Sequence, residues 1–366
     1  MKKIKLGELC KPSAGQIKED SDKLIDYIDI SSVDNETKKV TGYQTIAFRD
    51  APSRARKMVK RGSILVSTVR PNLNAVAMLE DDTPNITIAS TGFCILDCKE
   101  NANNRFIFNF CKSRAFIDDM VSQATGASYP AVSDKIVRSA LVPDYSYEEQ
   151  CKISEVLDRL SAVIDNRKAE LSALDELIRA RFVEMFGDPV SNSYGLPEAT
   201  LPELGEFGRG VSKHRPRNDP KLLGGEYPLI QTGDVANAGL YITSYNSAYT
   251  ELGLKQSKMW DKGTLCITIA ANIAKTAILE FDACFPDSVV GFTANERTNN
   301  VFIHYWFSFF QAILESQAPE SAQKNINLKI LSELKVIVPE KNKLDAFVEF
   351  INQVDKSKFV DVLMVV

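Results

Sequence analysis

A chain of 366 residues is longer than one ordinary domain and indicates two or three domains. Hydrophobic residues make up 44% and charged residues 25%, a composition typical of soluble globular proteins rather than disordered or fibrous ones. The formal charge of −4, from 44 basic and 48 acidic side chains, excludes a uniformly basic protein that coats nucleic acid but allows local basic faces.

The N-terminal residues MKKIKLGELCK include lysines but no apolar core and no small-residue cleavage site, so they do not predict a signal peptide. The longest apolar stretch, 301–314, is interrupted by His304, Ser308 and Gln311, so no membrane span is predicted. The seven cysteines are odd in number and scattered, which favours reduced thiols and a cytoplasmic location. Cys94 and Cys98 are close in sequence, and structural thiols are favoured there over a zinc site.

The chain repeats itself in four short matches that occur in the same order. The matched pairs are 6–9 with 201–204, 60–66 with 261–267, 90–93 with 289–292, and 135–143 with 329–339. Their offsets all lie between 194 and 201 residues. A nearly constant offset over four matches in the same order predicts a tandem duplication.

Each copy predicts the same succession of strands and helices. The first copy has a strand at 27–30, a buried strand at 63–69, an aromatic helix at 105–111 and a last strand ending at Pro143. The second copy has their counterparts at 228–230, 264–269, 301–310 and before Pro339. The aromatic side chains could stack on bases, but their recurrence on helical faces in both copies favours core packing. Each copy is therefore expected to be an α+β domain of roughly 140 residues.

A long helix without glycine or proline is predicted between the copies, at 148–186, and a shorter one follows the second copy, at 340–360. Both show coiled-coil seams, formed by Leu157, Leu160, Ile164, Leu171, Leu174 and Ile178 in the first and by Leu344, Phe347, Ile351 and Val354 in the second. The two stripes are expected to pair antiparallel within the chain. Because the second helix is short, part of the first seam, including Leu171, Leu174 and Ile178, is expected to be exposed. Such a stripe is expected to bind a partner subunit or a second copy of the chain.

The predicted fold class is therefore α+β, with two similar domains separated by long antiparallel coiled-coil helices. The predicted boundaries are 1–145 for the first domain, 146–187 for the spacer helix, 188–339 for the second domain and 340–366 for the distal helix.

Basic residues form one dense cluster in each copy. The first contains Arg49, Arg54, Arg56, Lys57, Lys60 and Arg61, and the second contains Arg209, Lys213, His214, Arg215, Arg217 and Lys221. Either cluster could be a solvated basic face. Arginine also suits bidentate contact with phosphate or guanine, so two such clusters in an acidic protein leave nucleic-acid binding equally open. We expect both to face the DNA if DNA is the ligand.

Polar side chains that follow the buried middle strands are candidates for contact with base edges. These are Arg70, Asn72 and Asn74 in the first copy and Asn272 and Lys275 in the second, with the loop residues Ser128, Tyr129, Lys324 and Asn325 as further candidates. For Asn72 and Asn74 ordinary turn formation after Pro71 is a strong alternative.

The motifs of several enzyme classes are missing from the sequence. It has no phosphate-binding Gly-x4-Gly-Lys-Ser/Thr motif and no GxGxxG. A nuclease-like set of Asp287, Glu333 and Lys335 could hold Mg²⁺, but its long spacing favours coincidence. We therefore expect a binding protein without catalytic residues, metal or cofactor of its own.

Several segments together resemble the DNA specificity subunits of type I restriction–modification systems. The spacer resembles that family's conserved helical region through YEEQCKISEVLDRL at 147–160 and LDELIRARFVEMFGDP at 174–189. STVRPNLN at 67–74 resembles one type of target-recognition domain, and KHRPRNDP at 213–220 with FPDSVVGF at 285–292 resembles another. The distal helix is shorter than is usual in the family, which suggests a truncation.

The resemblance implies that each domain reads half of a bipartite site in double-stranded DNA and that the helices set the gap. It implies methyltransferase subunits that bind S-adenosylmethionine and a restriction subunit that uses ATP and Mg²⁺, with no catalysis in this chain. Self-association through the exposed helix is also expected. The alternatives are a scaffold that binds proteins rather than DNA, and a Mg²⁺-dependent nuclease.

Overall fold

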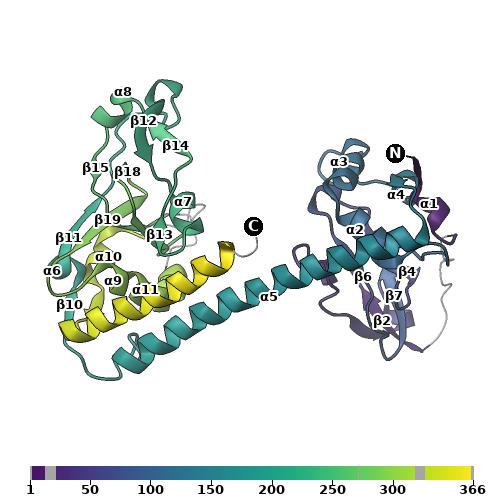
Figure 1. Cartoon of the computed structure of the whole chain (residues 1–366), viewed down its shortest axis with the longest axis horizontal. Coiled ribbons are helices and arrows are strands. Elements are labelled where there is room, and N and C mark those ends of the chain that lie inside the picture. The colour runs from purple at the N-terminus through teal and green to yellow at the C-terminus, as the bar shows by residue number, and fades with distance from the viewer. Residues whose placement is uncertain (1, 13–21, 271, 318–325, 364–366) are drawn as a thin grey trace. The chain divides into compact units, whose positions relative to one another are not determined.

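The computed structural model describes residues 2–12, 22–270, 272–317 and 326–363, with side chains described as far as Lys358. It divides into two compact units, Met1–Arg167 (unit 1) and Lys168–Val366 (unit 2). The helix α5 (Tyr147–Phe186) contributes its first part to unit 1 and the remainder to unit 2 (Figure 1). No helix within the described ranges is long and apolar enough to cross a lipid bilayer.

Unit 1 combines short strands with helices that follow them. The strands are β1 (Lys3–Lys5), β2 (Leu24–Ile28), β3 (Gln44–Ala47), β4 (Ala55–Met58), β5 (Ile64–Ser67), β6 (Val76–Met78), β7 (Ile86–Ser90), β8 (Phe93–Leu96) and β9 (Leu141–Pro143). The helices are α1 (Leu6–Leu9), η1 (Ile30–Ser32), η2 (Phe48–Asp50), η3 (Pro71–Leu73), α2 (Asn104–Lys112), α3 (Arg114–Ser122) and α4 (Asp134–Ser139).

Unit 1 is built in layers around its central sheet, which has the strand order β6-β5-β8. Successive side chains of a strand point to opposite faces. Accordingly, Leu65 packs toward the second sheet, β3-β2-β7-β4, while Ile64 and Val66 pack toward α2 and α3. Both faces are buried, which explains why β5 is apolar at three successive positions.

Unit 2 contains a longer succession of strands and helices. The strands are β10 (Glu198–Thr200), β11 (Gly205–Arg209), β12 (Leu223–Leu229), β13 (Tyr241–Ile242), β14 (Ser247–Tyr249), β15 (Met259–Trp260), β16 (Leu265–Thr268), β17 (Thr276–Leu279), β18 (Ala283–Cys284), β19 (Val289–Ala294) and β20 (Lys335–Ile337). The helices are α6 (Leu201–Leu204), η4 (Pro220–Leu222), α7 (Thr232–Asn237), α8 (Glu251–Lys255), α9 (Asn300–Gln317), α10 (Leu328–Glu333) and α11 (Lys341–Leu363). Its two larger sheets have the orders β11-β19-β16-β17-β13 and β14-β12-β18-β15.

The same pairings recur in both units. The first strand of each unit pairs antiparallel with its last strand, Ile4 opposite Val142 and Ala199 opposite Val336. A four-residue helix follows that first strand in each unit, α1 and α6, and the buried strands β5 and β16 pair with β8 and β19. The repeat seen in the sequence therefore corresponds to a repeated architecture.

The helices α5 and α11 run antiparallel within unit 2 (Figure 1). Asp175 pairs with Lys358 at 2.7 Å, whereas Phe182, further along α5, contacts Phe347, nearer the start of α11, with ring centres 5.5 Å apart. The α11 seam residues Leu344, Phe347, Ile351 and Val354 are all buried.

The predicted exposure of the C-terminal part of the α5 seam is wrong. Ile178 is fully buried, and Leu171 and Leu174 are partly buried. The reason is α9, whose Phe302 ring stacks on Phe182 at 5.2 Å, so that two helices rather than one cover this part of α5.

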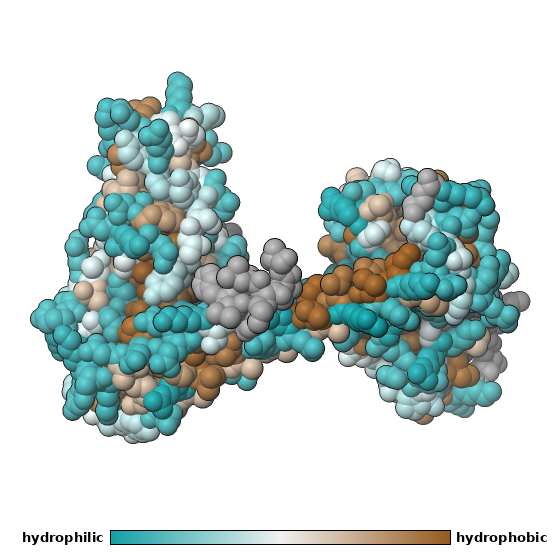
Figure 2. Space-filling model, in the orientation of Figure 1, coloured by the Kyte–Doolittle hydropathy of each residue, from teal (hydrophilic) through white to brown (hydrophobic). Residues whose placement is uncertain are grey.

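The exposed part of the seam lies earlier on α5, in unit 1. We call this set the α5 stripe; its members are Val156, Leu157, Leu160, Val163 and Ile164. Figure 2 shows apolar surface along this helix. An apolar helical face of this length is typical of a contact surface.

Candidate nucleic-acid interface

Two residues that the sequence singled out separately, Arg70 and Tyr129, contact one another in unit 1. Arg70 follows β5 in a left-handed backbone conformation (φ 48°), and its amide donates to the Pro130 carbonyl at 2.7 Å. This places the Arg70 guanidinium carbon 4.6 Å from the centre of the Tyr129 ring, which is itself 67% exposed. A guanidinium that lies over an exposed ring can still donate through its N–H groups, which suit bidentate contact with phosphate or guanine.

The neighbouring candidates divide into exposed and buried residues. Asn72 and Ser128 are exposed beside Arg70 and Tyr129. Asn74 is buried, and its side-chain amide donates to the Cys111 carbonyl at 3.0 Å. Asn74 therefore holds the turn in place, and its assignment to DNA contact is corrected to a structural role.

The basic cluster of unit 1 is largely engaged with acidic and aromatic partners. Arg49 pairs with Asp22 at 2.6 Å, and Arg54 pairs with Asp29 at 2.5 Å. The exposed Arg49 and Arg54 side chains can exchange such surface pairs for phosphate at little cost, since exposed ion pairs contribute at most about 1 kcal/mol. Arg56 lies over the Phe48 ring at 5.6 Å.

Lys57 is the exception in this cluster, because it points inward. In β4 the side chains alternate, so Ala55 and Lys57 face the interior while Met58 faces solvent. The Lys57 ammonium donates to the Phe93 carbonyl and pairs with Asp134, both at 2.6 Å. The prediction that Lys57 contacts DNA is therefore corrected to a buried structural ion pair.

The basic cluster of unit 2 is organised around one carboxylate, that of Asp287. Arg217 donates to one Asp287 oxygen, and Arg215 lies 3.6 Å from the other. Arg215 also donates to the Ser212 carbonyl at 2.6 Å, and His214 contacts Asp219 at 3.1 Å. Lys213 is exposed. Asp287 thus fixes two guanidinium groups at the surface, a positioning role that sequence analysis missed because 70 residues separate it from Arg217.

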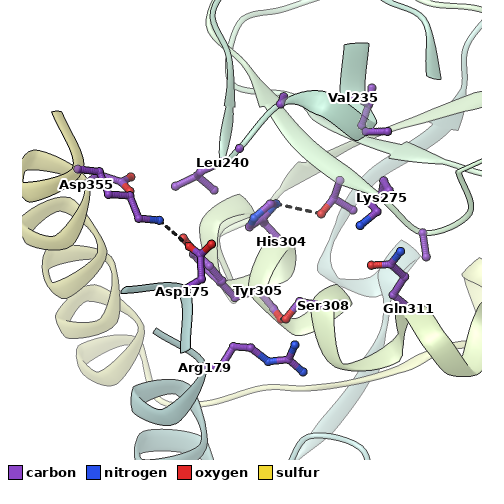
Figure 3. Close-up of a pocket in the computed structure, with 16 residues that line it drawn as sticks. Asp175, Arg179, Val235, Leu240, Lys275, His304, Tyr305, Ser308, Gln311 and Asp355 are labelled. Carbon is purple, nitrogen blue, oxygen red and sulfur yellow. Dashed lines mark hydrogen bonds and ion pairs between the residues drawn. The ribbon is translucent and has the colours of Figure 1, made fainter. Parts of the chain in front are cut away.

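The remaining candidates of unit 2 have different surroundings. Asn272 is exposed, while Lys275 lines a pocket of about 310 Å³ together with residues of α5, α9 and α11 (Figure 3). Lys324 and Asn325 lie outside the described residues.

The pocket in Figure 3 is held by polar pairs on its walls. His304 Nδ1 lies 2.9 Å from the Thr276 hydroxyl, and Lys358 donates to Asp175 at 2.7 Å. Burial lowers the pKa of His304 to about 4 and raises the pKa of Asp355. His304 is therefore neutral near pH 7, as expected for an imidazole whose role is packing and one hydrogen bond.

The nuclease-like set does not come together as a metal site. The Asp287 carboxylate is occupied by two arginines, and Glu333 pairs with Lys329 along one helix at 3.7 Å. Within the described ranges, no group of three or more His, Cys, Asp or Glu residues could hold a metal ion.

A known family model matches most of unit 2. Residues 198–359 match the family model of the type I restriction modification DNA specificity domain. These residues carry the sequence pattern of that specificity domain. The predicted resemblance to type I specificity subunits is therefore confirmed.

A curated relative of the specificity domain agrees with this assignment. The specificity subunit of the type I restriction enzyme HindI from Haemophilus influenzae is 26% identical over 145 residues. The aligned stretch covers 38% of this chain and 31% of that relative.

Solved structures show the fold at greater length. The S subunit of a type I restriction–modification system from M. genitalium covers 99% of this chain and 93% of its own length, at 13% identity and a TM-score of 0.54. A chain from a study of complex assembly and conformational transition in the type I system covers 98% of this chain and 90% of its own length, at 21% identity and a TM-score of 0.51. The α+β fold is thus shared beyond unit 2.

Proposed function

We propose that this chain is the DNA specificity subunit of a type I restriction–modification complex and has no catalytic activity of its own. The observation that carries the proposal is the specificity-domain match in unit 2, whose pairings of strands recur in unit 1. Each unit then reads one half of a bipartite site in double-stranded DNA.

In unit 1, DNA contacts Arg70 and Tyr129, with Asn72 and Ser128 beside them and Arg49, Arg54 and Arg56 on the phosphates. In unit 2, we propose contacts from Lys213, His214, Arg215, Arg217, Asn272 and Lys275. Arginine and asparagine are the side chains best suited to bidentate contact with guanine and adenine, respectively, in the major groove.

The helices α5 and α11 set the distance between the two half-sites. A helix of 40 residues is about 60 Å long, which corresponds to roughly 18 base pairs of B-DNA at 3.4 Å each. The ion pair of Asp175 with Lys358 supports antiparallel pairing of these two helices within unit 2.

The partners belong to the same proposal. Methyltransferase subunits dock on the α5 stripe and bring S-adenosylmethionine, and a restriction subunit brings ATP and Mg²⁺. The complex acts in the cytoplasm, where the DNA is.

The test uses the purified full chain together with its methyltransferase subunits. Sequencing of methylated bases in the source genome, with and without this gene, is expected to reveal a bipartite motif that disappears when the gene is deleted. Gel shifts of the complex on that motif should weaken steeply as salt rises, because phosphate contacts release counterions.

Two outcomes would point to the alternatives. Methylation that is unchanged by deletion of the gene, together with no DNA binding at low salt, supports a protein-binding scaffold. Cutting of DNA by the chain alone in Mg²⁺, abolished in Glu333→Gln, supports a nuclease.

A further inference from the structure

Two cysteines that are distant in sequence lie directly opposite each other in unit 1. Cys10 follows α1 and Cys98 follows β8, and the two residues form an isolated antiparallel bridge. Backbone hydrogen bonds flank the bridge on both sides, from the Lys11 amide to the Asp97 carbonyl at 2.7 Å and from the Lys99 amide to the Leu9 carbonyl at 2.9 Å. The local register of the two segments is therefore fixed.

This pattern of hydrogen bonds defines the geometry of the pair. The bonds join the neighbours of the two cysteines rather than the cysteines themselves, so Cys10 and Cys98 occupy a non-hydrogen-bonded position. At such positions the Cα atoms lie about 4.5 Å apart and the side chains approach closely. Disulfides span Cα separations of about 4.4–6.8 Å, so the pair can be bridged without separating the strands, near the short end of the range.

The surroundings of the pair favour reaction over inert packing. Arg138 spans the two segments, donating to the Lys11 carbonyl at 2.9 Å and to the Ile95 carbonyl at 3.0 Å. The hydrogen bond with Cys98 lowers the pKa of Cys10, and the positive charges of Arg138 and Lys99 act in the same direction. The same hydrogen bond raises the pKa of Cys98. The pair thus places a thiol of lowered pKa beside a second thiol that can donate a hydrogen bond to it.

The nearby thiols lack these features. Burial raises the pKa of Cys94 to about 12 and raises the pKa of Cys111 well above its ordinary value. Both side chains are fully buried. Cys10 is also buried, but its partner Cys98 is partly exposed, so a small oxidant can reach the pair from that side. Cys151, on α5, accepts a hydrogen bond from Asn103 and serves as a partly exposed reference.

We propose that Cys10 and Cys98 form a reversible disulfide when the chain meets a hydroperoxide. The Cys10 thiolate attacks one oxygen of hydrogen peroxide, the O–O bond breaks, and the leaving hydroxide takes a proton to become water. The Cys98 sulfur then attacks the Cys10 sulfenic acid, the S–S bond forms, and the S–O bond breaks. The second hydroxide leaves as water with the Cys98 proton, so two thiols and one peroxide give one disulfide and two waters.

The bridge would act as a staple on unit 1. It would tie the N-terminal segment, β1 and α1, to the end of β8, and β1 in turn pairs with β9, which leads into α5. Closing a loop of 88 residues restricts the unfolded chain, so oxidation should raise the melting temperature of the full chain by about 5 °C. Reducing conditions inside cells would reverse it, as for other redox-sensing disulfides.

The experiment treats the reduced full chain with hydrogen peroxide, blocks the remaining thiols, and maps the cross-links by mass spectrometry of peptides. We expect a peptide joining Cys10 to Cys98, reversal by dithiothreitol, and the rise in melting temperature. Cys10→Ser and Cys98→Ser should each abolish the rise, and the control Cys151→Ser should retain it.

The peptide map decides the matter even if a serine variant fails to fold. Wild-type chain in which Cys10 and Cys98 both remain free, are each oxidised separately to sulfinic acid, or bond to other cysteines would overturn the proposal.

Discussion

The Arg70 guanidinium lies over the ring of Tyr129 at 4.6 Å, although the two residues belong to loops far apart in the sequence. A strand end holds Arg70, and the Pro130 carbonyl fixes its backbone next to that ring. The contact orders a long side chain before any ligand arrives, so less entropy is lost when the arginine binds.

Arg70→Ala is expected to weaken binding to the specific DNA site by about 1–3 kcal/mol and to relax specificity at one position of one half-site. Arg70→Lys should lose most of the specificity because a lysine cannot make the bidentate contact. Tyr129→Ala should have a smaller effect in the same direction. Equilibrium binding to matched and mismatched duplexes measures all three.

Lys152→Ala is the matched control for charge, because Lys152 is an exposed lysine on α5 that pairs with Glu148 one turn earlier. It should change affinity little. Equal losses from Lys152→Ala and Arg70→Ala would mean that only net charge matters.

Lys57→Met is expected to lower stability while leaving DNA affinity per folded molecule unchanged. It leaves Asp134 and the Phe93 carbonyl without a buried partner, which should cost about 2 kcal/mol. Urea unfolding measures the loss, with the exposed Lys60→Met as control, for which less than about 0.5 kcal/mol is expected. A loss of DNA affinity in folded Lys57→Met would return Lys57 to the interface.

Periodicity and repetition predict the fold well here, because they depend on local spacing. The predicted helix at 148–186 matches α5 (Tyr147–Phe186), and the predicted buried strands at 63–69 and 264–269 contain β5 and β16. The pairing of β1 with β9 follows from chain topology rather than local pattern, so the sequence did not predict it.

The sequence predicts the candidate site less well, because exposure depends on tertiary contacts. Lys57 belongs to a basic cluster in sequence, but strand alternation turns it inward toward Asp134. Asp287 was considered as a metal ligand, and only the fold brings Arg215 and Arg217 to it. The coiled-coil spacing of α5 indicates pairing with one helix and does not reveal that α9 also covers Ile178. The sequence therefore predicts exposure where the structure shows burial.

In unit 2, Arg217→Ala should weaken DNA binding and reduce the dependence of log affinity on log salt by about one unit. Arg215→Glu should weaken it by a few kcal/mol at most. Asp287→Asn weakens the hold on both arginines and removes one negative charge, so nonspecific binding should strengthen while discrimination between sequences falls. The control Glu333→Gln makes the same charge change outside the cluster and should leave discrimination unchanged.

His304 should make stability depend on pH between about 4 and 6.5. Its pKa is about 4 in the folded chain and 6.5 when unfolded, so the unfolded state takes up its proton first as pH falls. The stability that neutral His304 contributes is fully present above pH 6.5 and is lost by pH 4. The free energy of unfolding falls by about 3 kcal/mol over this range.

The difference in unfolding free energy between the wild type and His304→Asn, measured at each pH, isolates this effect. The control is close in structure because the asparagine amide oxygen can still accept a hydrogen bond from the Thr276 hydroxyl. Asp355, whose raised pKa acts in the opposite direction, is present in both chains and cancels. A difference in unfolding free energy that stays constant from pH 4 to 8 would contradict the assignment.

The last prediction concerns the α5 stripe, where Leu160 and Ile164 are each 54% exposed. Burying such a side chain stabilises an interface by about 2 kcal/mol, so Leu160→Glu with Ile164→Glu should weaken docking of the methyltransferase subunit at least 100-fold. Because neither residue is in the core, the melting temperature should barely change. The isolated wild-type chain should self-associate in sedimentation, and the double variant should be monomeric. Leu177→Glu, at an exposed leucine of α5 outside the stripe, is the matched control and should change neither. A monomeric wild-type chain whose affinity for the methyltransferase subunit is unaffected by the two charges would show that the stripe is simply solvated.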